Sequence, residues 1–155
     1  MSRARILCIS GPNLQLLGTR EPSIYGKETL AAIHARLKTR AKELGVSITC
    51  KQTNHEGEIC DWLAEARTSK AGADGVLLNA GAYTHTSIAI HDAIKAIALP
   101  VVEVHLSNPE AREPFRRHSQ IAAACFARVA GFGGESYLIA LSGLVTHLRR
   151  GDAPK

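Results

Sequence analysis

The segment GPNLQLLGTREPSIYG, residues 11–26, contains a guanidinium and a phenol five positions apart, Arg20 and Tyr25. A free tyrosine has a pKa of about 10, so forming a tyrosinate at pH 7 costs about 4 kcal/mol. A guanidinium within about 4–6 Å could lower such a pKa by about 1–3 and make the phenol a general base. The alternative is a ring packed beneath the loop with the arginine in solvent, and spacing alone favours that alternative.

A second acid–base candidate is His105, which ends the apolar run VVEVH at residues 101–105. An imidazole can donate or accept a proton near neutral pH. Glu103 comes two positions earlier, so on a strand both side chains point to the same face. The carboxylate could therefore fix the tautomer of the imidazole for catalysis. A purely structural His–Glu pair at a strand end is an equally good interpretation.

His85 lies just before a predicted helix over residues 86–98. The first backbone N–H groups of a helix form a natural anion site. Thr84 or Thr86 could cap this helix, and such capping is compatible with anion binding.

Two arginines, Arg112 and Arg116, follow the run that ends at His105. On a helical turn they would share a face and could grip a carboxylate. The alternative is a solvated charged surface. The sequence has no HExxH, P-loop, GxGxxG or EF-hand spacing, and its seven histidines are scattered, so we expect no metal site.

Short apolar runs alternate along the chain with segments whose apolar residues have helical spacing. Strands joined through helices imply right-handed crossovers and a parallel sheet. We therefore expect an α/β fold, a doubly wound parallel five-stranded sheet with helices on both faces, in one domain over residues 1–150 followed by a loose tail at 151–155. The predicted strands cover residues 4–10, 46–50, 75–79, 101–105 and 125–130, and the predicted helices cover residues 27–44, 56–70, 86–98 and 135–149.

Polar side chains cluster where the predicted strands end. Asn13 follows the first strand, Asn79 ends the third, and Glu103 and His105 belong to the fourth. Ligands of open α/β sheets bind beyond the carboxyl ends of the strands, so these side chains predict an active site there. The two asparagines could position substrate hydroxyls or a water molecule, although asparagine is more common as a turn or cap residue.

The composition excludes several classes of protein. A chain of 155 residues with 45% hydrophobic and 21% charged residues forms one globular domain rather than a disordered segment. Lys and Arg number 19 and Asp and Glu 14, and the resulting net charge of +5 suits an anionic partner. Aromatic residues are only 5% of the chain, too few for a surface that stacks nucleic-acid bases.

The cysteines and apolar runs indicate a cytoplasmic protein. The four cysteines, Cys8, Cys50, Cys60 and Cys125, contain no CxxC pair, which excludes a zinc ribbon or a thioredoxin-like motif and favours a reducing compartment. No apolar stretch approaches the roughly 20 residues of a membrane span, and the run at residues 6–9 is too short for a signal peptide.

Four segments together resemble one family, the type II 3-dehydroquinate dehydratases. They are GPNLQLLGTREPSIYG at 11–26, NAGAYTHTSIAIHDA at 79–93, VEVHLSN at 102–108 and AREPFRRHS at 111–119. The resemblance extends over nearly the whole chain and implies a flavodoxin-like fold. It also implies a reversible anti elimination of water from 3-dehydroquinate, through an enolate, with no metal and no cofactor.

The resemblance implies a role for each catalytic residue. Tyr25 would remove the proton next to the ketone, and Arg20 would sustain its tyrosinate. Asn13 would hold a water molecule that stabilises the enolate oxygen. His105, backed by Glu103, would protonate the departing hydroxyl.

The expected substrate-binding set serves the hydroxyls and the carboxylate of a small anionic substrate. Asp92 matches a family position that reaches a neighbouring subunit's site, and the family usually forms a dodecamer of four trimers. Gln15 departs from the usual asparagine of the first motif and could alter the loop. The set comprises Asn79, Gly81, His85, Asp92, Leu106, Ser107, Arg112 and Arg116.

Two other functions remain open at this point. A flavodoxin-like module could bind a nucleotide or flavin, but the chain has no glycine-rich phosphate signature. A basic nucleic-acid binder would need its basic residues ordered on one reading element, whereas here they are spread over several predicted helices.

Overall fold

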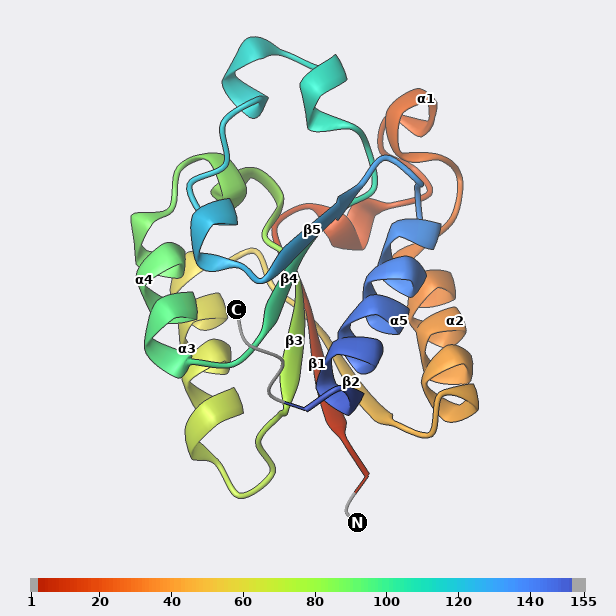
Figure 1. Ribbon diagram of the computed structural model, residues 1–155. Coiled ribbons are helices and arrows are strands. Elements are labelled where there is room, and N and C mark those ends of the chain that lie inside the picture. Colours follow the sequence, from red (N-terminus) through yellow and green to blue (C-terminus); the bar gives the residue numbers. More distant parts are fainter. Residues whose placement is uncertain (1–2, 152–155) are drawn as a thin grey trace.

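A five-stranded parallel sheet forms the centre of the protein, in the strand order β2-β1-β3-β4-β5 (Figure 1). This computed structural model describes residues 3–151. The expected α/β fold is confirmed, because every strand pair is parallel and the order is that of flavodoxin-like sheets. The strands are β1 (Arg5–Ser10), β2 (Ser47–Gln52), β3 (Gly75–Asn79), β4 (Val101–His105) and β5 (Ala127–Ala130).

Two helices cover each face of the sheet. Figure 1 shows α2 (Leu30–Glu43) and α5 (Glu135–Arg149) on one side, with α3 (Glu56–Thr68) and α4 (Ile88–Ile97) on the other. Each helix buries an apolar stripe against the sheet; in α2 that stripe comprises Leu30, Ile33, Leu37 and Ala41. Burial of apolar stripes on both faces gives the doubly wound arrangement its stability.

The helices α2 and α4 begin later than the sequence pattern predicts. The hydroxyl of Thr29 accepts a hydrogen bond from the Ala32 N–H, so α2 begins at residue 30 rather than 27. Ser87 caps α4 in the same way, accepting from the Ile90 N–H at 2.9 Å. The expectation that Thr84 or Thr86 caps this helix is therefore wrong.

Single-turn helices replace predicted loop in several places. Pro22–Tyr25 forms α1 within the first long loop, and Gly81–His85 forms a 3-10 turn before α4. Three further 3-10 turns lie between β4 and β5, at Pro109–Ala111, Pro114–Arg116 and Ala122–Ala124. Arg112 and Arg116 are thus not on one helical face, because Pro114 begins a new turn between them.

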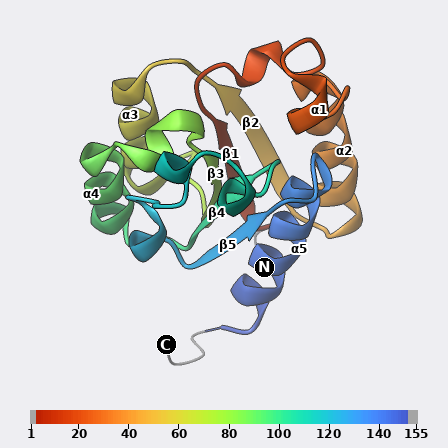
Figure 2. The ribbon, with the colours of Figure 1, turned by 90° about the horizontal axis from the view of Figure 1, so that it is seen from above.

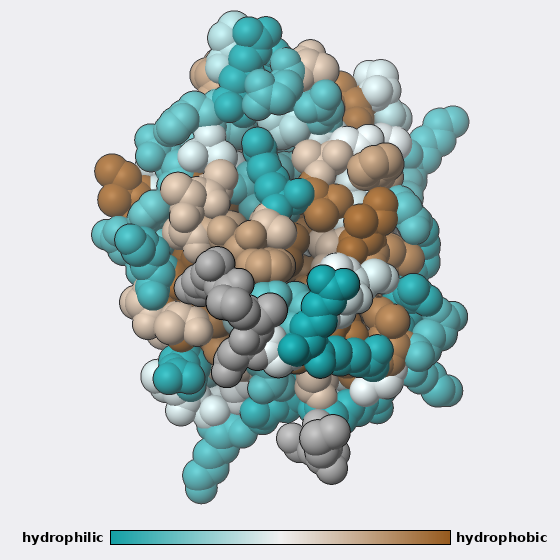
Figure 3. Space-filling model, in the orientation of Figure 1, coloured by the Kyte–Doolittle hydropathy of each residue, from teal (hydrophilic) through white to brown (hydrophobic). Residues whose placement is uncertain are grey.

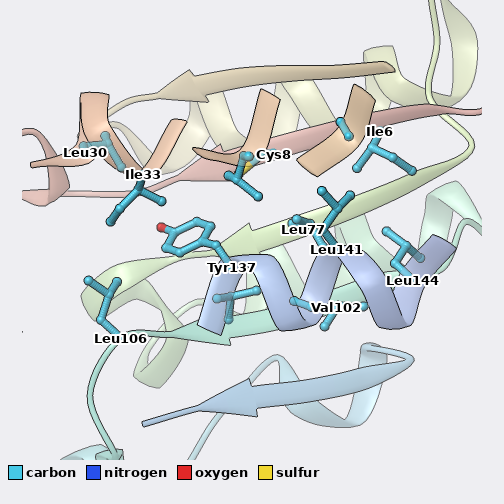
Figure 4. Packing of buried hydrophobic residues seen from close by; sticks show 14 of the residues in the cluster. Ile6, Cys8, Leu30, Ile33, Leu77, Val102, Leu106, Tyr137, Leu141 and Leu144 are labelled. Carbon is cyan, nitrogen blue, oxygen red and sulfur yellow. The ribbon is translucent and has the colours of Figure 1, made fainter. Parts of the chain in front are cut away.

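The core on the α2–α5 side includes a buried polar group, the hydroxyl of Tyr137. Figure 4 shows the Tyr137 ring among apolar side chains that include Ile33, Leu77 and Leu106, with its hydroxyl directed toward the carboxyl ends of the strands. Burial raises the pKa of this phenol well above its ordinary value, so the group stays protonated and acts as a hydrogen-bonding partner.

The loop after β1 and the loop after β3 touch through their backbones. The Gly11 N–H donates to the Asn79 carbonyl at 2.7 Å. A Cβ atom at residue 11 would lie 2.7 Å from the Ala80 carbonyl oxygen, so only glycine permits this approach. The contact holds two of the site-forming loops together.

No helix within residues 3–151 is long and apolar enough to cross a bilayer. Of the tail expected at 151–155, residues 152–155 lie outside the described part of the chain.

Candidate active site

A pocket that is open to solvent and has a cavity volume of about 70 Å³ lies at the carboxyl ends of the strands. Figure 2 looks down on this end, where the loops after β1, β3 and β4 converge. The pocket therefore occupies the position expected for a ligand site in such a sheet. Eleven of the expected site residues line it: Asn13, Arg20, Tyr25, Asn79, Gly81, His85, His105, Leu106, Ser107, Arg112 and Arg116.

Tyr25 lies close to two guanidinium groups. The Cζ atom of Arg20 is 4.8 Å from the centre of the Tyr25 ring, and that of Arg112 is 5.1 Å from it. The predicted Arg20–Tyr25 pair is thus present, and Arg112 joins it from the turns that follow β4. The Tyr25 ring therefore has two permanently charged guanidiniums as close neighbours in the pocket.

Glu103 and His105 form a tight pair behind the pocket. Nε2 of His105 donates to Oε2 of Glu103 at 2.6 Å. Because Nε2 is engaged, Nδ1 is the ring nitrogen that can exchange a proton with a ligand. The carboxylate is completely buried and is also held by the hydroxyl of Ser119 at 2.8 Å and by Nε of Arg128 at 2.8 Å.

The carboxylate of Glu103 is ionised despite its burial. Burial by itself raises its pKa. The hydrogen bonds from His105 and Ser119 and the charge of Arg128 outweigh that effect, so the pKa of Glu103 is lower than its ordinary value. A permanently negative group therefore orients the His105 ring.

His85 presents a hydrogen-bond acceptor to the pocket. Its Nδ1 donates to the His118 carbonyl at 2.8 Å. Burial lowers the pKa of His85, and the nearby charges of His105 and Arg116 lower it further against the effect of the His118 contact. The ring is consequently neutral at pH 7, with Nε2 unprotonated and able to accept a hydrogen bond from a hydroxyl.

Asn79 connects the pocket to the core. Its Nδ2 donates to the Tyr137 hydroxyl at 3.1 Å, and its Oδ1 accepts from the Gly81 N–H at 3.1 Å. Ser10 shares a hydrogen bond of 2.9 Å with the same Tyr137 hydroxyl. The side chain thus lines the pocket and also fixes the start of the turn that carries His85.

The first loop is anchored to the end of β2 by side-chain amides. Nε2 of Gln52 donates to Oε1 of Gln15 at 3.0 Å and lies 3.2 Å from the Gly11 carbonyl. Asn13 adopts a left-handed conformation with φ of 68°, and its N–H donates to Oδ1 of Asn54. Gln15 therefore braces the loop that carries Asn13.

Ser107 and the two later arginines complete the cationic wall. Nη1 of Arg112 donates to the Ser107 hydroxyl at 3.3 Å, and Nε of Arg116 donates to Glu113 at 2.8 Å. Leu106 is buried and lines the pocket beside Ser107. Both arginines reach the pocket from separate turns, so it has a guanidinium-rich surface suited to an anion.

Two expected residues are not part of the pocket lining: Glu103, which is buried behind the pocket, and Asp92. Asp92 is exposed on α4 and lies outside the lining.

Sequence reasoning also missed Ser119 and Arg128, which hold Glu103, because only the pairing of β4 with β5 brings residue 128 beside residue 103. Within residues 3–151 no cluster of His, Cys, Asp and Glu has the geometry of a metal site.

Comparison with known proteins gives a consistent result. The family described as "Dehydroquinase class II" matches residues 4–145. The 3-dehydroquinate dehydratase of Jannaschia sp. (strain CCS1) is 53% identical over 150 residues, covering 97% of this chain and 99% of its own. That of Rhizobium johnstonii is 54% identical over 139 residues, covering 90% and 94%.

Solved structures are similar over the same length. The crystal structure of type II dehydroquinase from Butyrivibrio crossotus DSM 2876 superposes with a TM-score of 0.90 at 39% identity, covering 93% of this chain and 99% of that one. The type II dehydroquinase from Propionibacterium acnes gives a TM-score of 0.86 at 40% identity, covering 94% and 99%.

Proposed function

Because this chain belongs to the class II dehydroquinase family, we propose that its pocket converts 3-dehydroquinate to 3-dehydroshikimate by a reversible anti elimination of water. One observation carries the proposal. A tyrosine close to two guanidiniums and a histidine bonded to a buried carboxylate line the same pocket. Such a pocket offers a base and an acid to one small ligand, as a hydro-lyase requires.

Tyr25 is the base in this proposal. A proton next to a ketone is weakly acidic, and a phenolate can remove it when its own negative charge is stabilised. Arg20 and Arg112 supply that stabilisation, since their guanidiniums lie 4.8 and 5.1 Å from the centre of the Tyr25 ring. The other two tyrosines have structural partners, since Tyr137 is buried in the core and the Tyr83 hydroxyl donates to the Asn54 carbonyl.

Loss of that proton produces an enolate, whose oxygen needs a hydrogen-bond donor. Asn13 lines the pocket, and its backbone is fixed in the left-handed region by the brace to Asn54. A water molecule held by the Asn13 side chain would donate to the enolate oxygen as the negative charge develops.

His105 is the acid in this proposal. The departing hydroxyl leaves as water once a proton reaches it. The imidazolium of His105 can supply that proton from Nδ1, because Nε2 remains bonded to Glu103 throughout. In the reverse direction the same nitrogen takes the proton back.

The remaining pocket residues bind the substrate. Its carboxylate suits the guanidinium of Arg116 and the hydroxyl of Ser107, and its hydroxyls suit Nε2 of His85 and the side chain of Asn79. Gly81 and Leu106 line the pocket beside these groups. All of these roles are performed by side chains and backbone of the protein, so the proposed chemistry requires neither a metal nor a cofactor.

Family membership does not favour a nucleotide- or flavin-binding module or a nucleic-acid partner. The reaction belongs to the shikimate pathway, which leads to the aromatic amino acids, and it also occurs in quinate catabolism. The protein's four thiols are free, which supports a location in the reducing cytoplasm.

A homo-oligomer, a dodecamer built from trimers, is also part of the proposal. Figure 3 shows hydrophobic side chains gathered around β5 and α5, where Phe126 and Phe132 are exposed. On α4, Ile88 is 65% exposed and lies one turn before Asp92. A neighbouring subunit packed on Ile88 would cover Asp92 and place this carboxylate near a second site. Light scattering tests the assembly: the parent should have the mass of a dodecamer, and Ile88→Asp should have a lower mass. A monomer mass for the parent, or the same mass for both proteins, would contradict the proposed assembly.

The activity has a direct test. The product contains a conjugated enone, which absorbs ultraviolet light that the substrate does not absorb. Purified protein mixed with 3-dehydroquinate should give a steady rise in absorbance, and Tyr25→Phe should give almost none while its thermal unfolding is unchanged. Absence of a rise with the parent protein, beside an active control enzyme, would refute the proposed function.

A further inference from the structure

Arg128 lies beside the buried carboxylate of the site on a neighbouring strand. In the pairing of β4 with β5, Glu103 is opposite Arg128. Paired residues of parallel strands project from the same face of the sheet, so the two side chains meet. Nε of Arg128 lies 2.8 Å from Oε2 of Glu103. Arg128 does not line the pocket and has no role in the chemistry described so far.

The oxygen that Arg128 contacts is also the one that orients His105. Oε2 of Glu103 accepts from His105 Nε2 at 2.6 Å, whereas Oε1 accepts from the Ser119 hydroxyl at 2.8 Å. Of the three groups that contact the carboxylate, His105 and Ser119 can be neutral, but the guanidinium of Arg128 is always charged. The side chain of Glu103 is 0% exposed and that of Arg128 is 32% exposed, so the charge reaches the carboxylate from the edge of the sheet.

The guanidinium of Arg128 changes the balance between the protonated and the neutral imidazole of His105. With neutral donors alone, a buried carboxylate is compensated only while the imidazole is protonated, and the ring would hold its proton tightly. A permanent cation on the same oxygen compensates the carboxylate in both states. It also repels the imidazolium, so release of the proton becomes easier.

We propose that Arg128 is a positioning residue that keeps Glu103 charged in both states of His105 and so makes the His105 proton available to the departing hydroxyl. This inference rests on the proposed function for its catalytic consequence. The electrostatic claim, that Arg128 changes the charge balance between Glu103 and His105, does not depend on the proposed function.

Other titratable and charged groups near the pair do not reproduce this effect. Burial, with the charge of Glu103, raises the pKa of the Cys125 thiol to about 12, so it is neutral at working pH. His85 is neutral for the reasons given above, with its ring centre 6.5 Å from that of His105. The guanidinium of Arg116 donates a hydrogen bond to Glu113, and those of Arg20 and Arg112 lie near the Tyr25 ring. Within residues 3–151, Arg128 is the cation in direct contact with Glu103.

The test compares Arg128→Gln, Arg128→Lys and a charge control, Arg67→Gln, which removes an exposed cation from the last turn of α3. Two readouts are taken, the pH profile of kcat and KM, and the NMR titration of the His105 ring. In Arg128→Gln, the NMR titration of the ring should move to higher pH than in the parent. Its kcat at pH 7 should fall about three- to tenfold, with KM unchanged within about twofold. Arg128→Lys should have a His105 titration and a kcat close to those of the parent, and Arg67→Gln should match the parent in both.

The outcomes separate the inference from the proposed function. If Arg128→Gln is merely less stable in urea, with the parent's His105 titration and pH profile, Arg128 is only structural and the inference is overturned. If the parent protein does not turn over 3-dehydroquinate, the proposed function fails, and the NMR titration still decides the electrostatic claim. Should Arg128→Gln not fold, Arg128→Met keeps the aliphatic stem without charge and gives the same comparison.

Discussion

The hydroxyl of Tyr137 accepts a hydrogen bond from Nδ2 of Asn79 at 3.1 Å, in the interior between α5 and β3. Tyr137 is completely buried, and Asn79 is 3% exposed. Through Oδ1, the same asparagine holds the Gly81 N–H at the start of the turn that leads to His85. The core and the pocket therefore share a hydrogen-bonded connection, and a change in one should be felt in the other.

Tyr137→Phe tests this connection. The substitution keeps the ring but leaves the Asn79 amide and the Ser10 hydroxyl without a buried partner. We expect the free energy of unfolding to fall by about 1–3 kcal/mol, together with a several-fold loss of kcat/KM. Urea denaturation and steady-state kinetics measure the two effects. Unchanged stability and activity would mean that the hydroxyl has no structural role.

Gln15→Ala tests the brace on the first loop. Gln52 loses its contact with Gln15 but keeps the Gly11 carbonyl nearby, so the free energy of unfolding should change by less than about 1 kcal/mol. The loop would be less ordered before substrate binds, and KM should rise about two- to fivefold with kcat nearly constant. Thr68→Ala is a matched control, because it also removes one side-chain hydrogen bond but on α3. An equal KM in the two variants would show that Gln15 does not order the loop.

Acid unfolding should report the charge of Glu103. Its pKa is lower in the folded protein than in the unfolded chain, where a glutamate titrates near about 4.3. The stabilisation from the ionised carboxylate is therefore present above that pH and is lost as the pH falls through the folded value. At pH 7, Glu103→Gln should be about 3 kcal/mol less stable than the parent. Denaturation curves from pH 7 to pH 2 should show this difference shrinking below about pH 4, whereas a constant difference would argue against an ionised Glu103.

Two of the strands and the starts of α3 and α5 lie at the residues predicted from the sequence, whereas α2 and α4 begin later than predicted. The runs GVLLN and VVEVH became β3 and β4 at the predicted residues, because a parallel strand buried on both faces is continuously apolar. The later starts of α2 and α4 depend on which hydroxyl turns back to cap the helix, a local choice between neighbouring Ser and Thr residues. The turn α1 has no apolar stripe to signal it.

The part of the candidate site that is formed by residues at the ends of the strands could be predicted from the sequence. Parallel strands deliver their carboxyl ends to one edge, which is why His105 and Asn79 meet the first loop. The second guanidinium at Tyr25 and the cation at Glu103 could not be predicted in this way. Arg112 depends on how the turns after β4 fold back, and Arg128 depends on the register of β5.

The central claim is that Tyr25 removes the proton next to the ketone and that His105 acts only in the later loss of water. Exchange of that proton into deuterated water, followed by NMR of 3-dehydroquinate, separates the two steps. His105→Ala should still exchange the proton while forming almost no enone, and Tyr25→Phe should do neither. Exchange at the parent's rate in Tyr25→Phe, or none in His105→Ala, would contradict the assignment of base and acid.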